Sequence, residues 1–226
     1  GKHRNQGTGE RKMAVFFPEI LDDFLSTSFL EGIRRKFHYG EEPDGELWEV
    51  AGEMLPRIRE AAFWESRAHA FQTKADAVRY EDVAMSLGSG LDRLQEWYHK
   101  EGLLSKSYML EVLAGELLMR GYGACNDALS RKTGWHVAGY HFPGNGEDFP
   151  LEMLPRLLDR LTLKIRCNAA FCMIPQKSVA FIAELTKDEN IRCQGICAGC
   201  SNGNCPGRVT RKIGNEVENG TFVSFF

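Results

Sequence analysis

Four cysteines fall within thirteen residues near the end of this 226-residue chain, and they constrain its structure more than any other feature. Cys193, Cys197, Cys200 and Cys205 follow the spacing C-x3-C-x2-C-x4-C. Thiolates this close in sequence can surround a tetrahedral zinc ion or a [4Fe–4S] cluster. The glycines between them allow the backbone to turn tightly. Residues 192–208 are therefore predicted to form a cysteine-rich metal-binding segment.

The form of the run favours an iron–sulfur cluster over zinc. Pro206 follows the last cysteine, as in ferredoxin-type segments. Zinc sites usually pair two C-x2-C units across a longer insert. The first three cysteines also match the C-x3-C-x2-C of radical S-adenosylmethionine enzymes, but too few residues follow them for the barrel of such enzymes. Zinc, and free or regulatory thiols, remain alternatives.

The other three cysteines have a different surrounding. Cys125 lies in an apolar helical pattern, and Cys167 and Cys172 lie in a strand-like stretch. We interpret all three as small buried hydrophobic residues.

Composition and charge narrow the class of protein. Hydrophobic residues make up 43% and charged residues 26% of the chain, which is typical of a globular protein with a substantial core. A net charge of −3 argues against nucleic acid or an anionic membrane as the main partner. Residues 1–12 are polar and lack the apolar core of a signal peptide, so we expect a disordered arm and a cytoplasmic protein. Reduced thiols in that compartment favour metal binding over disulfides.

Hydrophobic periodicity predicts one α+β domain over residues 13–226. Pro56 is expected to kink or divide the second helix of the series. The expected helices cover 16–33, 46–64, 91–98, 108–130 and 151–161. The expected strands cover 83–87, 167–174, 178–185 and 217–226. Residues 134–149, rich in glycine and aromatic residues, are expected to form a loop.

Two segments, VAGYHFPGNGEDFPLEMLPRLLDRL and FCMIPQKSVAFIAEL, resemble the activation (reactivation) domain of vitamin B12-dependent methionine synthase and the short stand-alone proteins of that family. The resemblance extends over roughly residues 38–208. It implies a single α+β domain with a mainly antiparallel twisted sheet flanked by helices. The matching residues are Gly139-Tyr140, the helix at 151–161, Met173-Ile174-Pro175, Ser178-Val179, and Cys197, Cys200 and Cys205 with Pro206.

The resemblance also implies a chemistry. In that family the domain docks over the corrin of cobalamin, binds S-adenosylmethionine and supports reductive methylation of inactive cob(II)alamin. Tyr140 matches the family's tyrosine beside the cobalt. The candidate cofactor-binding residues are Trp135, Val137, Gly139, Tyr140 and His141. Trp135 stands where the family has an arginine for the carboxylate of S-adenosylmethionine, so we expect S-adenosylmethionine binding only as an alternative.

Together these observations predict an accessory protein that reactivates a cobalamin-dependent methyltransferase. It would dock on a corrinoid protein and donate an electron from a [4Fe–4S] cluster. The alternatives are a non-catalytic binding module with structural zinc and an activation subunit that binds S-adenosylmethionine. The prediction assigns no catalytic residue.

Overall fold

A five-stranded antiparallel sheet forms the centre of the protein, in the strand order β1-β2-β3-β7-β4. The structure, a computed structural model, describes residues 13–37, 45–70, 78–145, 147–161, 164–191, 193 and 195–196. The strands are β1 (Met13–Val15), β2 (Phe63–Ala68), β3 (Val78–Ser86), β4 (His136–His141), β5 (Arg166–Cys167), β6 (Met173–Ile174) and β7 (Ser178–Thr186). The helices are α1 (Pro18–Asp23), α2 (Thr27–Lys36), α3 (Gly45–Ala61), α4 (Ser89–Lys100), α5 (Leu104–Thr133), the short 3-10 helix η1 (Leu151–Met153) and α6 (Leu154–Leu161).

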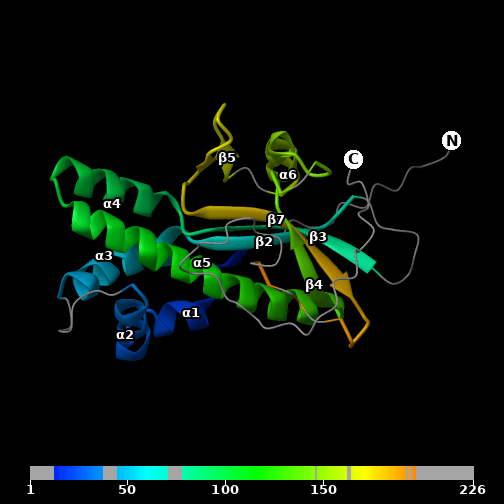
Figure 1. The fold of residues 1–226 in the computed structure, drawn as a ribbon, viewed down its shortest axis with the longest axis horizontal. Coiled ribbons are helices and arrows are strands. Elements are labelled where there is room, and N and C mark those ends of the chain that lie inside the picture. Colours follow the sequence, from blue (N-terminus) through cyan, green and yellow to red (C-terminus); the bar gives the residue numbers. More distant parts are fainter. Residues whose placement is uncertain are drawn as a thin grey trace.

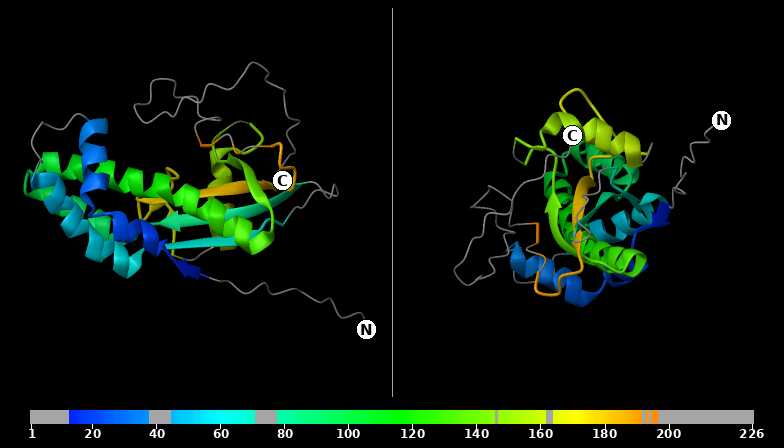
Figure 2. Two further views of the ribbon diagram at one scale, coloured as in Figure 1. Left: turned by 90° about the horizontal axis from the view of Figure 1, so that it is seen from below. Right: turned by 90° about the vertical axis from the view of Figure 1, so that its right-hand side faces the viewer.

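Helices cover both faces of the sheet. The long helix α5 runs across one face, whereas α6 lies on the other face beside the β5–β6 hairpin (Figure 1). Helices α1 to α4 gather at one end of the molecule, around the first half of α5 (Figure 2). The prediction of a single α+β domain with a mainly antiparallel sheet flanked by helices is confirmed.

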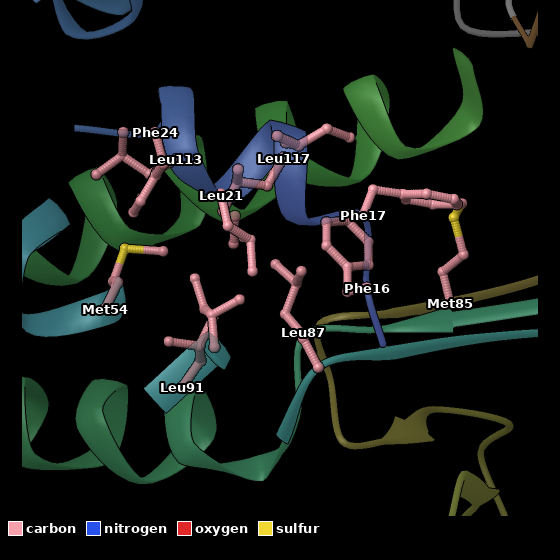
Figure 3. Close-up of a cluster of buried hydrophobic side chains, with 14 of the residues drawn as sticks. Phe16, Phe17, Leu21, Phe24, Met54, Met85, Leu87, Leu91, Leu113 and Leu117 are labelled. Atoms are coloured by element: carbon pink, nitrogen blue, oxygen red, sulfur yellow. The ribbon is translucent and has the colours of Figure 1, made fainter. Parts of the chain in front are cut away.

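Two hydrophobic clusters follow from the alternation of side chains along the central strands. Val83 and Met85 of β3 point with Phe181 of β7 into the larger cluster, which α1 to α5 complete. Figure 3 shows side chains of α1, α3, α4 and α5 gathered in this cluster together with Met85 and Leu87. Ala84 of β3 and Ile182 of β7 face the opposite way, into a smaller cluster closed by the leucines of α6.

Pro56 does not divide α3, contrary to one of the two expected outcomes. A proline cannot donate a hydrogen bond to the carbonyl four residues earlier, which here belongs to Gly52. Both Gly52 and Pro56 are exposed, so water can satisfy that carbonyl. The opposite face of α3 carries Met54 and Ile58 into the core without interruption.

The helix expected over 46–64 ends at Ala61, because residues 63–68 form strand β2. Phe63 and Glu65 are buried while Trp64 and Ser66 are less so, which is the alternation of a strand. The expected helix over 16–33 is likewise two helices, separated at Phe24–Ser26, and Ser26 caps the second by accepting a hydrogen bond from Phe29 N at 3.1 Å.

The stretch 167–174 is a hairpin and not a single strand. The Asn168 side chain accepts hydrogen bonds from Ala170 N at 2.9 Å and Cys172 N at 3.0 Å, and Phe171 adopts a positive φ of 59°. The turn leaves Cys167 half-buried and Cys172 exposed, so Cys172 is not the buried residue expected from the sequence. Cys125 is fully buried, as predicted. The expected strand at 217–226 lies outside the described residues.

Candidate functional site

Four of the five candidate cofactor-binding residues lie on a strand and not in a loop, and Trp135 directly precedes that strand. Residues 136–141 form β4, the edge strand that pairs with β7. Val137 is paired with Leu185 but Gly139 with Glu184, so Ala138 is an extra residue in the ladder. This bulge shifts by one position the alternation of side chains between the two faces of the sheet. It turns Tyr140 toward α5, on the same face as Val137, while His141 faces the α6 side.

Trp135 and Val137 belong to the core, with exposed fractions of only 5% and 3%. The Trp135 ring is flanked by two cations, with the Arg79 guanidinium 4.6 Å and the Lys187 ammonium 5.0 Å from the ring centroid. The structure thus gives Trp135 a role in joining the ends of β3, β7 and β4. A direct contact of either residue with a cofactor stays a prediction.

Tyr140 is the centre of an aromatic cluster between β4 and α5. Its ring centroid lies 5.3 Å from that of Phe181 and 5.5 Å from that of Tyr122, both in edge-on arrangements. Phe142 lies 6.4 Å from Tyr140. The Tyr140 hydroxyl donates a hydrogen bond to Asn126 Oδ1 of α5 at 2.7 Å.

Cys193, the first cysteine of the predicted metal-binding segment, lies near Tyr140. The chain leaves β7 and returns along β4, where His136 Nε2 lies 3.0 Å from the carbonyl oxygen of Ile191. Cys193 is half-buried with a free thiol, and it packs with Ile196 against the larger hydrophobic cluster. Tyr140 packs against the same cluster.

The surroundings of Tyr140 raise the pKa of its hydroxyl well above the usual value. Burial is the main cause, because it disfavours the phenolate, and the neighbouring Cys193 is the second. Tyr140 therefore keeps its proton throughout the neutral range and can act as a hydrogen-bond donor.

The remaining cysteines of the predicted segment, Cys197, Cys200 and Cys205, lie outside the described residues. Within the described residues, no group of three or more His, Cys, Asp and Glu side chains is arranged to hold a metal ion. Of the four predicted ligands, the structure describes Cys193, which packs against the same hydrophobic cluster as the predicted cofactor-binding residue Tyr140.

His141 and Gly139 belong to a separate polar row on the α6 side of the sheet. His141 Nε2 lies 2.9 Å from Glu184 Oε2, and the His141 ring packs edge-on against Tyr80. Gly139 is the ladder partner of Glu184. Burial first, and the Glu184 charge second, raise the pKa of Tyr80. The bulge therefore separates His141 from Tyr140, with which the sequence analysis grouped it.

A buried ionic cluster continues this row and was missed in the sequence. Asp82 and His69 have fully buried side chains, with His69 Nδ1 2.6 Å from Asp82 Oδ1. Arg160 of α6 forms an ion pair with Asp82, with Arg160 Nη2 2.5 Å from Asp82 Oδ2. The geometry of this pair is not that of a hydrogen bond. The available signal was Asp82, which directly precedes the apolar run Val83-Ala84-Met85 of β3.

A buried cation, Lys177, anchors the turn between β6 and β7 to the helices. Its ammonium donates to Glu111 Oε1 at 2.5 Å and to Gln95 Oε1 at 3.1 Å. Asp92 of α4 accepts from Gln176 N at 3.0 Å. These contacts satisfy the buried charge and account for its burial by structure alone.

In the described part of the chain, no helix is at once long and apolar enough to cross a membrane. No known family model matches the chain, and no curated protein matches it either, so the resemblance to the methionine synthase activation domain stays a prediction.

Proposed function

We propose that this protein is an accessory protein for the reductive reactivation of a cobalamin-dependent methyltransferase. It docks over the corrin of a corrinoid-binding partner with the surface formed by β4 and the facing part of α5. It holds a [4Fe–4S] cluster through Cys193, Cys197, Cys200 and Cys205. When bound, the cluster supplies the single electron that converts cob(II)alamin to cob(I)alamin, and an external low-potential reductant replaces that electron.

One observation carries this proposal: Cys193 and Tyr140 pack against the same hydrophobic cluster, and Cys193 is close enough to raise the pKa of the Tyr140 hydroxyl. The resemblance puts Tyr140 beside the cobalt, and the cysteine spacing puts Cys193 in a metal site. The two residues are far apart in sequence, and the fold brings them to the same hydrophobic cluster. An electron leaving a site at Cys193 would therefore start close to the surface that is proposed to receive the corrin.

The surroundings of Cys193 fit a metal ligand. The thiol is free and only half-buried, so a metal can reach the sulfur. The aromatic rings of Tyr122, Tyr140 and Phe142 hold this part of the chain in an apolar setting.

The test is electron transfer from the reduced protein to cob(II)alamin. The chain is purified without oxygen, reduced with dithionite, freed of excess reductant and mixed with cob(II)alamin, alone or in a carrier protein. The absorption spectrum should show formation of about one cob(I)alamin per reduced cluster. Cys200→Ser should abolish it by removing a predicted ligand.

Cys172→Ser is the matched control, because Cys172 is exposed on the β5–β6 hairpin and outside the proposed site. It should reduce cob(II)alamin as the unmodified protein does. A chain that holds its cluster but leaves cob(II)alamin oxidised would refute the proposal. A chain that holds one zinc would be a binding module, and retention of labelled S-adenosylmethionine in equilibrium dialysis would indicate the activation-subunit alternative.

A further inference from the structure

Two exposed cations lie over the buried ring of Trp135, where the ends of three strands meet. Trp135 directly precedes β4, whose first residue, His136, is opposite Thr186, so Trp135 and Lys187 are cross-strand neighbours. Arg79 reaches the same ring from β3, on the far side of β7. The guanidinium carbon of Arg79 lies 4.6 Å and Lys187 Nζ lies 5.0 Å from the ring centroid. We call Arg79 and Lys187 the Trp135 cation pair.

The two positive charges have no counter-ion in the part of the chain that the structure describes. Arg79 and Lys187 are exposed, and their described side-chain interactions are the two contacts with the Trp135 ring. An aromatic ring attracts a cation but does not neutralise its charge. Glu81, which is two residues from Arg79 on β3 and shares its face, is already paired with Lys132 at 2.7 Å. Because like charges repel, the fold gains little from placing both cations at one ring.

The carboxylates of the turn after β7 do not compensate the cation pair either. Asp188 Oδ1 accepts hydrogen bonds from Asn190 N and Asn190 Nδ2, both at 2.9 Å. Glu189 is exposed, and among the described residues it forms no ion pair with either cation. Arg131 adds a further exposed positive charge in the last turn of α5. Positive charges therefore outnumber negative ones at this end of the sheet, in a chain whose net charge is −3.

The ring holds both cations in place before any partner arrives. Trp135 is only 5% exposed, so the packing of the core fixes the ring. A cation held over a fixed ring loses less side-chain freedom on binding than a cation that moves freely in water. Arginine and tryptophan are also enriched among the residues that dominate the binding energy of protein interfaces. The arrangement therefore suits recognition of an anionic partner.

The cation pair borders the proposed docking surface. Helix α5 ends, β4 begins and β7 ends at the same end of the molecule (Figure 1). A guanidinium binds a carboxylate through two parallel hydrogen bonds, and an ammonium supplies a point charge. We propose that Arg79 and Lys187, held by Trp135, form an electrostatic contact for carboxylates on an acidic surface of the corrinoid-binding partner. This inference rests on the proposed function, because it takes that partner as the protein that docks on β4 and α5.

The test measures binding of a fluorescein-labelled hexaglutamate peptide to the full-length protein by fluorescence anisotropy. Arg79→Gln and Lys187→Gln should each weaken binding about 2- to 5-fold at low salt, which is the loss expected for one exposed ion pair. The double variant should lose both factors, and binding to the unmodified protein should weaken as the salt rises from about 0.01 M to about 0.15 M. Arg79→Lys keeps the charge and should keep most of the affinity, which separates an effect of charge from an effect of packing.

Lys100→Gln is the matched control. Lys100 is exposed at the end of α4, at the opposite end of the molecule (Figure 1), so its replacement should leave the affinity for hexaglutamate unchanged. Thermal unfolding of each variant shows whether the fold is retained.

The outcomes separate this inference from the proposed function. Equal affinities for the double variant and the unmodified protein, or no binding of hexaglutamate at all, would overturn the contact even if the protein reduces cob(II)alamin. Loss of hexaglutamate binding in the double variant of a protein that never reduces cob(II)alamin would support a contact with an acidic protein and remove the proposed function. Tighter binding of inorganic pyrophosphate than of hexaglutamate, lost in the same double variant, would assign the pair to a small phosphate ligand and overturn the acidic partner.

Discussion

Replacement of Asp82 by alanine tests whether the buried ionic cluster is desolvated as the structure indicates. The Asp82 side chain is fully buried in the middle of β3, with His69 on one oxygen and Arg160 on the other. The variant removes the anion and leaves the Arg160 guanidinium facing the sheet without its carboxylate partner. A buried ion pair that loses one member usually destabilises a protein more than either partner contributes when exposed.

The size of the effect follows from the burial of the two partners. Breaking a buried ion pair costs about 3–5 kcal/mol. Arg160 keeps 28% of its side chain exposed, so water solvates part of the stranded charge and the lower end of that range applies. We therefore expect a loss of about 3 kcal/mol in the free energy of unfolding. For a domain of this size, such a loss lowers the melting temperature by roughly 6–12 °C.

The assay is urea unfolding followed by circular dichroism at pH 7. Asp22→Ala is the matched control, because Asp22 pairs with Arg59 at 3.4 Å while both side chains are more than half exposed. This control should lose less than about 1 kcal/mol. If Asp82→Ala also loses less than about 1 kcal/mol, then Asp82 is solvated in solution and the buried cluster is not a structural element.

Two further predictions concern α5. Gly121→Ala should destabilise the protein by about 1–3 kcal/mol, because a Cβ there would lie 3.1 Å from Met85 Sδ and 3.2 Å from Phe16 Cζ. Gly115→Ala, whose Cβ would have no described atom within 4 Å, should stabilise the protein by about 0.5–1 kcal/mol, and equal changes in melting temperature for the two variants would contradict this packing. Burial raises the pKa of the Cys125 thiol from its ordinary value of 9.0 to about 12, so the folded protein should protect this thiol from a disulfide reagent at pH 8. Because the unfolded chain loses this proton first, the unmodified protein should lose stability relative to Cys125→Ala as the pH rises from about 9 to about 12, and a constant difference between the two would contradict the assignment.

The sequence predicted those helices and strands whose buried residues follow a regular pattern or a continuous apolar run. Helix α5 has an apolar face repeated over many turns, and β3 and β7 contain apolar runs that are buried on both sides of the sheet. Their existence, and the α+β class, follow from local pattern alone. Their ends were less certain, and β3 begins five residues before the predicted strand because Glu81 and Asp82 interrupt its apolar run.

Strand β4 could not be recognised by alternation. Ala138 is the extra residue of a bulge, so Trp135, Val137 and Tyr140 share a face although Tyr140 is out of phase with the other two. Glycine and aromatic residues then gave the appearance of a loop. The pairing that stabilises this edge strand comes from β7, which is distant in sequence.

The candidate site was predicted only in its parts. Cysteine spacing singled out Cys193, and the family resemblance singled out Tyr140. Their proximity depends on the return of the chain after β7 along β4. The Tyr140 hydroxyl is held by Asn126 of α5, which carries no recognisable motif. A hydrogen-bonding side chain supplied by tertiary packing leaves no trace in local spacing, so Asn126 could be found only in the structure.

The iron and acid-labile sulfide content of protein purified without oxygen tests the central claim most directly. The proposed function predicts about four irons and four sulfides per chain, and their loss in Cys200→Ser. One zinc per chain with no sulfide would contradict it, because a zinc site held by the same thiolates has no electron to give.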